Sequence, residues 1–215
     1  MTQGLESCSA CGGKDKGCQV CPVRNHLYQL LYESNIPVKY WSLSMDDFTG
    51  DPGLKSKFTS YVSDLQKSYR DCHNLLLTGT HGIGKTMMVT GILKHVAASK
   101  YSGLYVTMND LVNYLVAASE TAAARKQLIT VDFLVVDEFD PRHIGSQAQS
   151  DLFGRVFEDI FRTRVQNSMP TILCSNSPDA ISGFKGAIKT SLESLMNYVD
   201  KYFSLLNKDM RKDKK

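Results

Sequence analysis

A glycine-rich segment near the middle of the chain has the composition of a phosphate-binding loop. It matches the pattern G-x4-G-K-[ST], follows the apolar residues Leu75 to Leu77 and precedes an amphipathic stretch. Its glycines allow backbone N–H groups to turn toward phosphate oxygens, and the helix expected next adds the positive end of its dipole. We expect the whole loop to line a nucleoside triphosphate; its residues are Gly79, Thr80, His81, Gly82, Ile83, Gly84, Lys85 and Thr86.

The last two residues of the loop carry most of its chemistry. We expect the ammonium group of Lys85 to reach the β- and γ-phosphates and the hydroxyl of Thr86 to ligate Mg²⁺. His81 fills space in the loop, and we assign it no chemical role. An ordinary glycine turn is the alternative, but the flanking strand and helix favour a phosphate site.

Two consecutive acids follow a second apolar run. Asp137 and Glu138 come directly after Phe133 to Val136. Ligands of α/β sheets bind at the carboxyl edge of the strands, so Asp137 is placed to hold Mg²⁺, directly or through water. Glu138 can polarise a water molecule for attack on the γ-phosphate. The alternative is that both acids only cap the junction between strand and loop.

A polar amide follows a third apolar strand. Thr171 to Ser175 reads as a buried strand, and Asn176 comes directly after it. Asn176 can orient the attacking water or contact the γ-phosphate. It can also be a turn former ahead of Pro178.

Four cysteines near the start of the sequence form the pattern C-x2-C-x6-C-x2-C, namely Cys8, Cys11, Cys18 and Cys21. Two such pairs complete a tetrahedral thiolate site, for which Zn²⁺ is the default ion. An iron–sulfur cluster or disulfides are the alternatives. Four thiolates leave no open position for water, so we expect a structural, docking role for the zinc. Cys72 and Cys174 stand alone and are expected to be buried structural residues.

Composition places the chain among soluble globular proteins. Its 215 residues are 42% hydrophobic and 22% charged, which argues against disorder. There is no apolar run long enough for a membrane helix and no secretory signal, so we expect a cytoplasmic protein without a membrane partner. The net charge of +3 comes from the last stretch of the chain and is weak evidence for nucleic acid.

Short apolar strands alternate with amphipathic helices from Asn74 onward, which predicts an α/β fold with a parallel five-stranded sheet flanked by helices. We expect three regions: a zinc module at 1–23, a helical lead-in at 24–72 and an ATPase domain at 73–215. The predicted strands are Asn74–Thr78, Leu104–Thr107, Phe133–Val136, Thr171–Ser175 and Tyr202–Leu206. The predicted helices include Arg24–Ser34, Lys55–Tyr69, Lys85–Ser99, Asp110–Ala118, Gln147–Val165 and Leu192–Tyr198.

Taken together, these motifs resemble the AAA+ ATPases, and within them the DnaC/IstB-type helicase loaders. The order of the motifs resembles the Walker A, Walker B and sensor 1 elements, and Asn35 to Tyr40 and Asp209 to Arg211 resemble the family's lead-in and ending. The stretch after Asn176 is too short for the helical lid of most AAA+ proteins, so the resemblance implies a core without a lid domain.

The chain departs from the family at one position. The loaders carry Ser-Arg-aliphatic near the end, where the arginine reaches the ATP of a neighbouring subunit, but the best match is Ser194-Leu195-Met196. Arg162 and Arg164, at the end of the long helix after the second motif, are alternative candidates for this arginine finger. They can also be helix-end cations favoured by the dipole.

The resemblance implies an ATP- and Mg²⁺-dependent loader of a replicative hexameric helicase. It implies self-assembly through the ATP interface, a grip on single-stranded DNA, and docking of the helicase by the zinc module and the following helix. One alternative is an IstB-like transposition helper that assembles on duplex DNA and recruits a transposase. Another is an adaptor that binds ATP without hydrolysing it, against which Glu138 argues.

Overall fold

The computed structural model describes residues 19–116, 121–144, 147–177, 180–181, 183–185, 189–190, 192–193 and 199–203. Cys8, Cys11 and Cys18 lie outside the described residues, and so does the side chain of Cys21. The zinc module therefore stays a prediction. The same holds for the Ser194–Met196 and Asp209–Arg211 motifs and for the expected absence of a lid.

A parallel sheet of five strands forms the centre of the protein, as the sequence predicted. The strands are β1 (Asn74–Thr78), β2 (Gly103–Thr107), β3 (Phe133–Asp137), β4 (Thr171–Ser175) and β5 (Val199–Phe203). They lie in the order β2-β3-β4-β1-β5, and every neighbouring pair is parallel. All five carboxyl ends therefore lie at one edge, where the loops after β1, β3 and β4 meet.

The first four strands match their predicted bounds to within one residue, but β5 begins three residues earlier than predicted. The reason is that β5 is an edge strand paired only with β1. Its second residue, Asp200, is exposed, so the continuous apolar run that marks a buried strand is missing.

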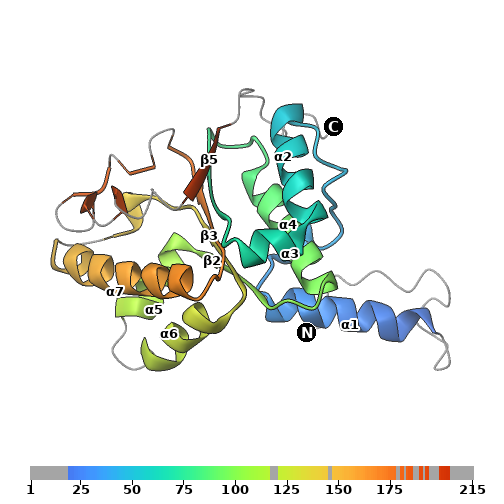
Figure 1. Cartoon of the computed structure of the whole chain (residues 1–215), viewed down its shortest axis with the longest axis horizontal. Helices are drawn as coiled ribbons and strands as arrows, with labels where there is room; N and C mark the ends of the chain where they lie inside the picture. Colours follow the sequence, from blue (N-terminus) through green and yellow to red (C-terminus); the bar gives the residue numbers. More distant parts are fainter. Residues whose placement is uncertain are drawn as a thin grey trace.

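Helices cover both faces of the sheet (Figure 1). One face carries α1 (Val20–Glu33), α2 (Pro52–Ser63), α3 (Leu65–Arg70) and α4 (Lys85–Ala98), and the other carries α5 (Met108–Val116), α6 (Thr121–Thr130) and α7 (Gln147–Gln166). Successive strand residues face opposite layers. Leu75 and Leu77 thus pack in the cluster with α4, whereas Leu76 packs in the cluster with α5 and α7.

The lead-in departs from the predicted boundaries in two places. α1 begins at Val20, so Cys21 falls in its first turn and the boundary predicted at residue 23 crosses a helix. The predicted helix from Lys55 to Tyr69 is two helices, α2 and α3, which are separated at Asp64. Asp64 leaves helical geometry with φ of −126°, and its carboxylate accepts a hydrogen bond from the N–H of Lys67. This is the behaviour of an N-cap residue.

The 3-10 turns η1 (Val38–Tyr40) and η2 (Pro141–His143) complete the described elements. Within the described ranges, no helix combines the length and apolar character that crossing a membrane requires.

A buried arginine joins the elements at the amino edge of the sheet. Arg164 in α7 is fully buried and donates to the carbonyl oxygens of Leu128, Val131, Asp132 and Pro170 and to Oγ1 of Thr171, at 2.7–3.1 Å. Burial lowers its pKa to about 10, so the guanidinium keeps its charge at neutral pH. A side chain held in this way cannot reach a neighbouring subunit. The finger role considered for Arg164 is therefore incompatible with its placement, which is structural.

We expect Arg164→Met to lower the free energy of unfolding by about 3 kcal/mol, because four carbonyl groups and the Thr171 hydroxyl, most of them buried, lose the guanidinium donor. The matched control is Arg162→Met in the same helix. Arg162 is half-exposed and pairs with Glu158, so this change costs about 1 kcal/mol or less. Urea unfolding followed by circular dichroism measures both, and equal losses would contradict the anchoring role of Arg164.

Candidate nucleotide-binding site

The predicted phosphate loop lies between the end of β1 and the start of α4. Its backbone bends sharply because Gly79, Gly82 and Gly84 have φ values of 147°, 84° and 91°. A residue with a Cβ atom would be strained at these φ values, so these three positions depend on glycine. Gly84 is also the residue before the first turn of α4, so the loop ends at the positive end of the helix dipole.

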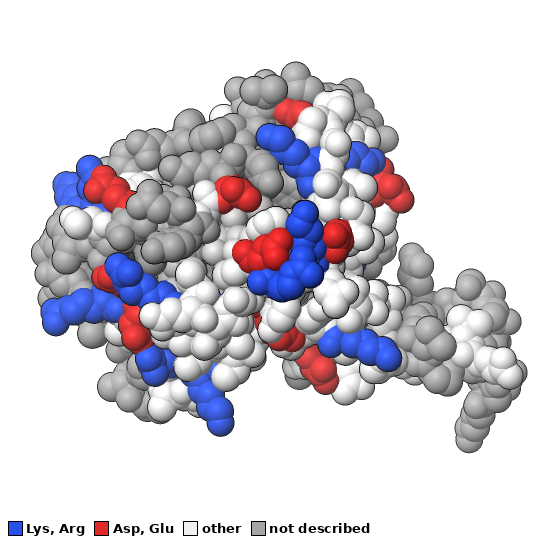
Figure 2. Space-filling model, viewed as in Figure 1, with Lys and Arg blue, Asp and Glu red and all other residues white. Residues whose placement is uncertain are grey.

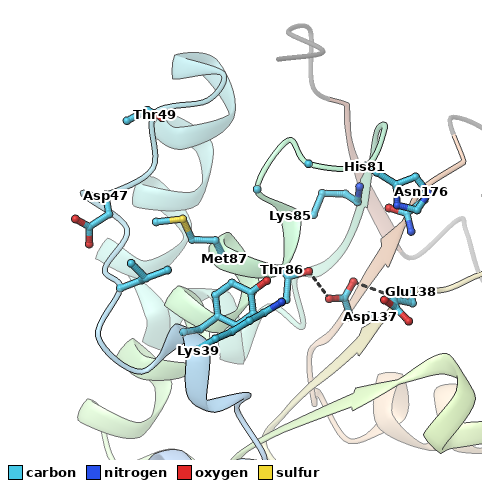
Figure 3. A pocket seen from close by; sticks show the side chains of 14 residues that line it. Lys39, Asp47, Thr49, His81, Lys85, Thr86, Met87, Asp137, Glu138 and Asn176 are labelled. Carbon is cyan, nitrogen blue, oxygen red and sulfur yellow. Dashed lines mark hydrogen bonds between the residues drawn. The ribbon is translucent and has the colours of Figure 1, made fainter. Parts of the chain in front are cut away.

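Lys85 points back across the loop. Its Nζ donates to the carbonyl oxygens of Gly79 and Thr80 at 2.8 and 2.9 Å, and the residue is only 6% exposed. The Lys85 side chain extends along the loop toward the side of the cavity where His81 lies (Figure 3). Its predicted contact with the phosphates stays a prediction, which this position in the loop allows.

Thr86 and Asp137 meet, although they lie on different elements. The Thr86 hydroxyl donates to Oδ2 of Asp137 at 2.7 Å, and Asp137 is 3% exposed. A hydroxyl and a carboxylate oxygen beside a phosphate cradle are ligands suited to Mg²⁺, which takes the rest of its shell from phosphates and water. The two residues thus fit a magnesium ion. Among the described residues no cluster of three or more His, Cys, Asp or Glu provides another metal site.

Tyr105 is a site residue that sequence reasoning missed. Its hydroxyl donates to the same Oδ2 of Asp137 at 2.9 Å, and burial raises the pKa of this phenol. The N–H of Glu138 donates to Oδ1 of Asp137. Three donors thus fix the orientation of the carboxylate. The contact arises because Tyr105 and Asp137 lie two residues apart in the register of β2 and β3, which no local pattern shows.

Glu138 adopts a backbone conformation that is uncommon for a side-chain-bearing residue, with φ of 53°. The next residue, Phe139, is fully buried, and its N–H donates to the carbonyl oxygen of Cys174 at 2.7 Å. The chain therefore turns sharply at Glu138, whose exposed side chain lines the cavity next to Asp137 (Figure 3). This places a carboxylate where a water molecule could approach the end of a triphosphate.

Asn176 lines the same cavity. It follows β4, and β4 lies between β3 and β1. Its amide therefore lies on the same side of the cavity as Lys85 and His81 (Figure 3). The residues that the sequence predicted on three separate loops lie together, although the chemical role of Asn176 stays a prediction.

The cavity has a volume of about 700 Å³, which is within the range of small-molecule sites. Its second wall comes from the lead-in and was not predicted: Lys39, Tyr40, Leu43, Asp47 and Thr49. Asp47 and Thr49 lie across from the phosphate loop, with Met87 between them and the loop (Figure 3). A triphosphate held at the loop would extend its nucleoside toward this wall.

We expect Lys85→Ala to weaken ATP binding at least about 100-fold, because two or more charge-assisted hydrogen bonds to phosphate are lost. Calorimetric titration with ATP and Mg²⁺ measures the change. Thermal unfolding without nucleotide checks that the fold persists. Lys126→Ala, on the exposed side of α6, is the matched control. Unchanged affinity in Lys85→Ala would exclude this lysine as a phosphate ligand.

Comparisons with known proteins agree with this geometry. Residues 24–180 match the family described as IstB-like ATP binding protein. The replicative helicase loader DnaI of Bacillus subtilis (strain 168) is 28% identical over 138 residues, covering 61% of this chain and 43% of that protein. The IS1162 putative ATP-binding protein of Pseudomonas fluorescens is 32% identical over 114 residues, covering 52% of this chain and 47% of that protein. The chain thus spans less than half the length of these two relatives.

A crystal structure of DnaI superposes with a TM-score of 0.65 at 20% identity, covering 81% of this chain and 94% of that one. At this identity the likeness shows a shared fold, and the predicted α/β P-loop architecture is confirmed. The family match extends over most of the chain and includes the phosphate loop, the acid pair and Asn176. The chain belongs to the IstB-like ATP binding protein family.

Proposed function

We propose that this protein binds and hydrolyses ATP in an oligomer and loads a replicative hexameric helicase onto single-stranded DNA. The observation that carries the ATPase part is the meeting of Lys85, Thr86 and the acid pair in one cavity. The loader part is supported by the similarity to the helicase loader DnaI. Because the chain spans less than half of that relative, the helicase and DNA partners are inferred by likeness.

The proposed hydrolysis divides the work among the residues of the cavity. The loop amides and Lys85 bind the phosphates, and Thr86 and Asp137 would hold Mg²⁺, which when bound neutralises charge on the phosphates. Glu138 orients a water molecule in line with the γ-phosphate and accepts its proton. Asn176 donates an amide hydrogen bond to the γ-phosphate or the attacking water.

The cavity itself supplies no arginine, since none occurs among the described residues that line it. An arginine finger contributes about 10³–10⁵ in rate to related phosphoryl transfers, so a fast ATPase here needs one from a neighbouring subunit. Arg162 remains the candidate of the two considered, because its side chain is 46% exposed on the surface of α7, where it pairs with Glu158 at 2.8 Å. This requirement supports assembly through the ATP interface.

The helicase-docking role is proposed for the cysteine segment and α1. The amino-terminal part of α1 extends from the body of the protein (Figure 1) and leaves Val20 and Leu27 about half exposed. Tyr32, near the other end, is 67% exposed. Such apolar side chains on a projecting helix are suited to contact a protein partner. A zinc ion on Cys8, Cys11, Cys18 and Cys21 would give the preceding segment a fixed shape.

The surface charge of the described residues does not mark where DNA would bind. On the face shown in Figure 2, basic and acidic side chains are interspersed over the described residues. No single basic stripe marks a groove on that face, so the single-stranded DNA in the proposal comes from the likeness to loaders.

The second candidate function is an IstB-like transposition helper, favoured by the similarity to the IS1162 protein. It would use the same cavity on duplex DNA and recruit a transposase. Affinity purification from the native host separates the two, because a loader retains a hexameric helicase and a helper retains a transposase. Retention of a transposase without helicase would overturn the loader proposal.

We expect Glu138→Gln to lower the ATPase rate at least about 100-fold while leaving ATP affinity within a factor of about three. The amide has nearly the same shape but cannot accept the proton. The rate is measured with single-stranded DNA and the purified helicase present. Wild-type protein that binds ATP but shows no turnover under these conditions would instead support the non-hydrolysing adaptor.

We expect Cys8→Ser combined with Cys11→Ser to lose bound zinc, because two of four ligands are removed. Elemental analysis should find about one zinc per wild-type chain and almost none in the variant. Helicase binding should fall while ATP affinity stays, because the described residues that line the cavity come from other parts of the chain. Full helicase binding by the zinc-free variant would contradict the docking role, and Cys72→Ser serves as the control.

A further inference from the structure

A single lysine in α4 holds the segment that forms the second wall of the cavity. Lys94 donates from Nζ to the carbonyl oxygens of Tyr40 and Leu43, and to that of Trp41 at 3.0 Å. An ammonium group has three N–H donors, so these three carbonyls use all of them. Lys94 is separated from Tyr40 by 54 residues in the chain, and the contact is therefore tertiary.

The segment that Lys94 holds has little regular structure of its own. Between the end of α1 and the start of α2 the only helical element is the three-residue turn η1. The carbonyl oxygen of Tyr40 also accepts a hydrogen bond from the N–H of Leu43 at 3.2 Å, so Lys94 adds to a turn that the backbone closes at this point. Further along, Lys55 donates to the carbonyl oxygen of Asp46 at 3.0 Å, which fixes the segment at a second point.

Close packing against α4 adds to this attachment. A Cβ atom on Gly91, one turn before Lys94, would come within 2.6 Å of the Met45 side chain. Met45 is buried in the same cluster as α4. The segment is thus pressed against the helix that begins at the phosphate loop, and a change in its attachment would alter the cavity.

Lys94 itself does not line the cavity, whereas Lys39, Tyr40 and Leu43 do. Two of the three carbonyls that Lys94 binds belong to these lining residues, Tyr40 and Leu43. The lysine is half-buried, and burial lowers its pKa, an effect that nearby Asp47 opposes. Burying an ammonium group is unfavourable unless its donors are satisfied, so the carbonyls must stay in place around it.

We propose that Lys94 is a positioning residue for the nucleoside end of ATP, because it holds the lead-in wall at the spacing from the phosphate loop that the ligand requires. The inference rests on the ATP-binding part of the proposed function and not on helicase loading. It assigns to Lys94 an effect on nucleotide affinity, exerted through the lining residues, and no part in the chemical step.

The test compares Lys94→Met with Lys126→Met. Methionine keeps much of the aliphatic length and removes every donor, and Lys126 lies exposed on α6, on the opposite face of the sheet. We expect Lys94→Met to weaken ATP binding about tenfold, because the lining residues lose their fixed position and not because a contact with ATP is removed. The rate at saturating ATP should stay within a factor of about two. Lys126→Met should match the wild type in both.

Two further measurements separate positioning from other causes. Hydrogen exchange of amides 38–49 should be faster in Lys94→Met without nucleotide, while exchange in β1 and β3 is unchanged. The affinity loss should persist at about 0.5 M salt, where a long-range effect of the missing charge would be screened. If Lys94→Met does not fold, Lys94→Gln, which keeps a neutral donor, is measured by the same criteria.

ATP affinity within a factor of two of the wild type, or a lost rate with retained affinity, would overturn the inference. So would a loss that disappears at high salt, or unchanged exchange in segment 38–49. A wild-type protein that does not bind ATP would instead refute the proposed function, and the exchange comparison would still decide whether Lys94 holds the segment.

Discussion

The hydrogen bond between the Thr86 hydroxyl and the Asp137 carboxylate joins the two halves of the site, and the remaining geometry depends on it. Thr86 belongs to the first turn of α4 and Asp137 to the last position of β3, 51 residues later. The contact forms only when the first turn of α4 packs beside the carboxyl end of β3. Tyr105 reaches the same carboxylate from β2, through the register of β2 and β3.

The two edges of the sheet are stabilised in different ways. At the amino edge, Arg164 donates hydrogen bonds to carbonyl oxygens of the segments that lead into β3 and β4. Asn74, at the start of β1, accepts a hydrogen bond from the N–H of Thr171. Arg164, Thr171 and Asn74, which form this network, are buried. The carboxyl edge carries the phosphate loop, the acid pair and Asn176 around a cavity. The amino edge thus fixes the strand positions, and the carboxyl edge is left for binding.

The lead-in is part of the site as well as a connection to it. Its first part pairs with the outer strand, since the N–H of Tyr105 donates to the carbonyl oxygen of Ser34 and the Asn35 amide donates to the carbonyl oxygen of Tyr105. Its second part forms the cavity wall and is held by Lys94. The segment between α1 and α2 thus contacts both the edge of the sheet and the nucleotide cavity. A partner bound at α1 would be connected to the cavity through this segment.

Local patterns predicted much of this protein. The glycine spacing before Lys85, the apolar run that ends in Asp137, and the strand before Asn176 are short, contiguous signals, because each reflects buried strands and a loop that needs glycine. These signals were sufficient to predict the parallel sheet and which residues line the phosphate side of the cavity. Two elements with less contiguous signals were predicted incorrectly. The start of β5 was placed too late because charged residues interrupt its apolar pattern. The helices α2 and α3 were predicted as one, because hydrophobic periodicity alone does not reveal the aspartate that separates them.

Tertiary structure decided the contacts between residues far apart in the chain. Arg162 and Arg164 are two residues apart on one helix and have the same chemistry, yet the rotation of α7 buries one and exposes the other. Tyr105, Lys94 and the lead-in wall gave no sequence signal, because their roles depend on strand register and on carbonyl groups that every residue has. The amino-acid sequence determined which groups could bind phosphate. Only the packing of α4 and the lead-in against the sheet determined what surrounds them, because such contacts depend on distances in space that side-chain spacing does not encode.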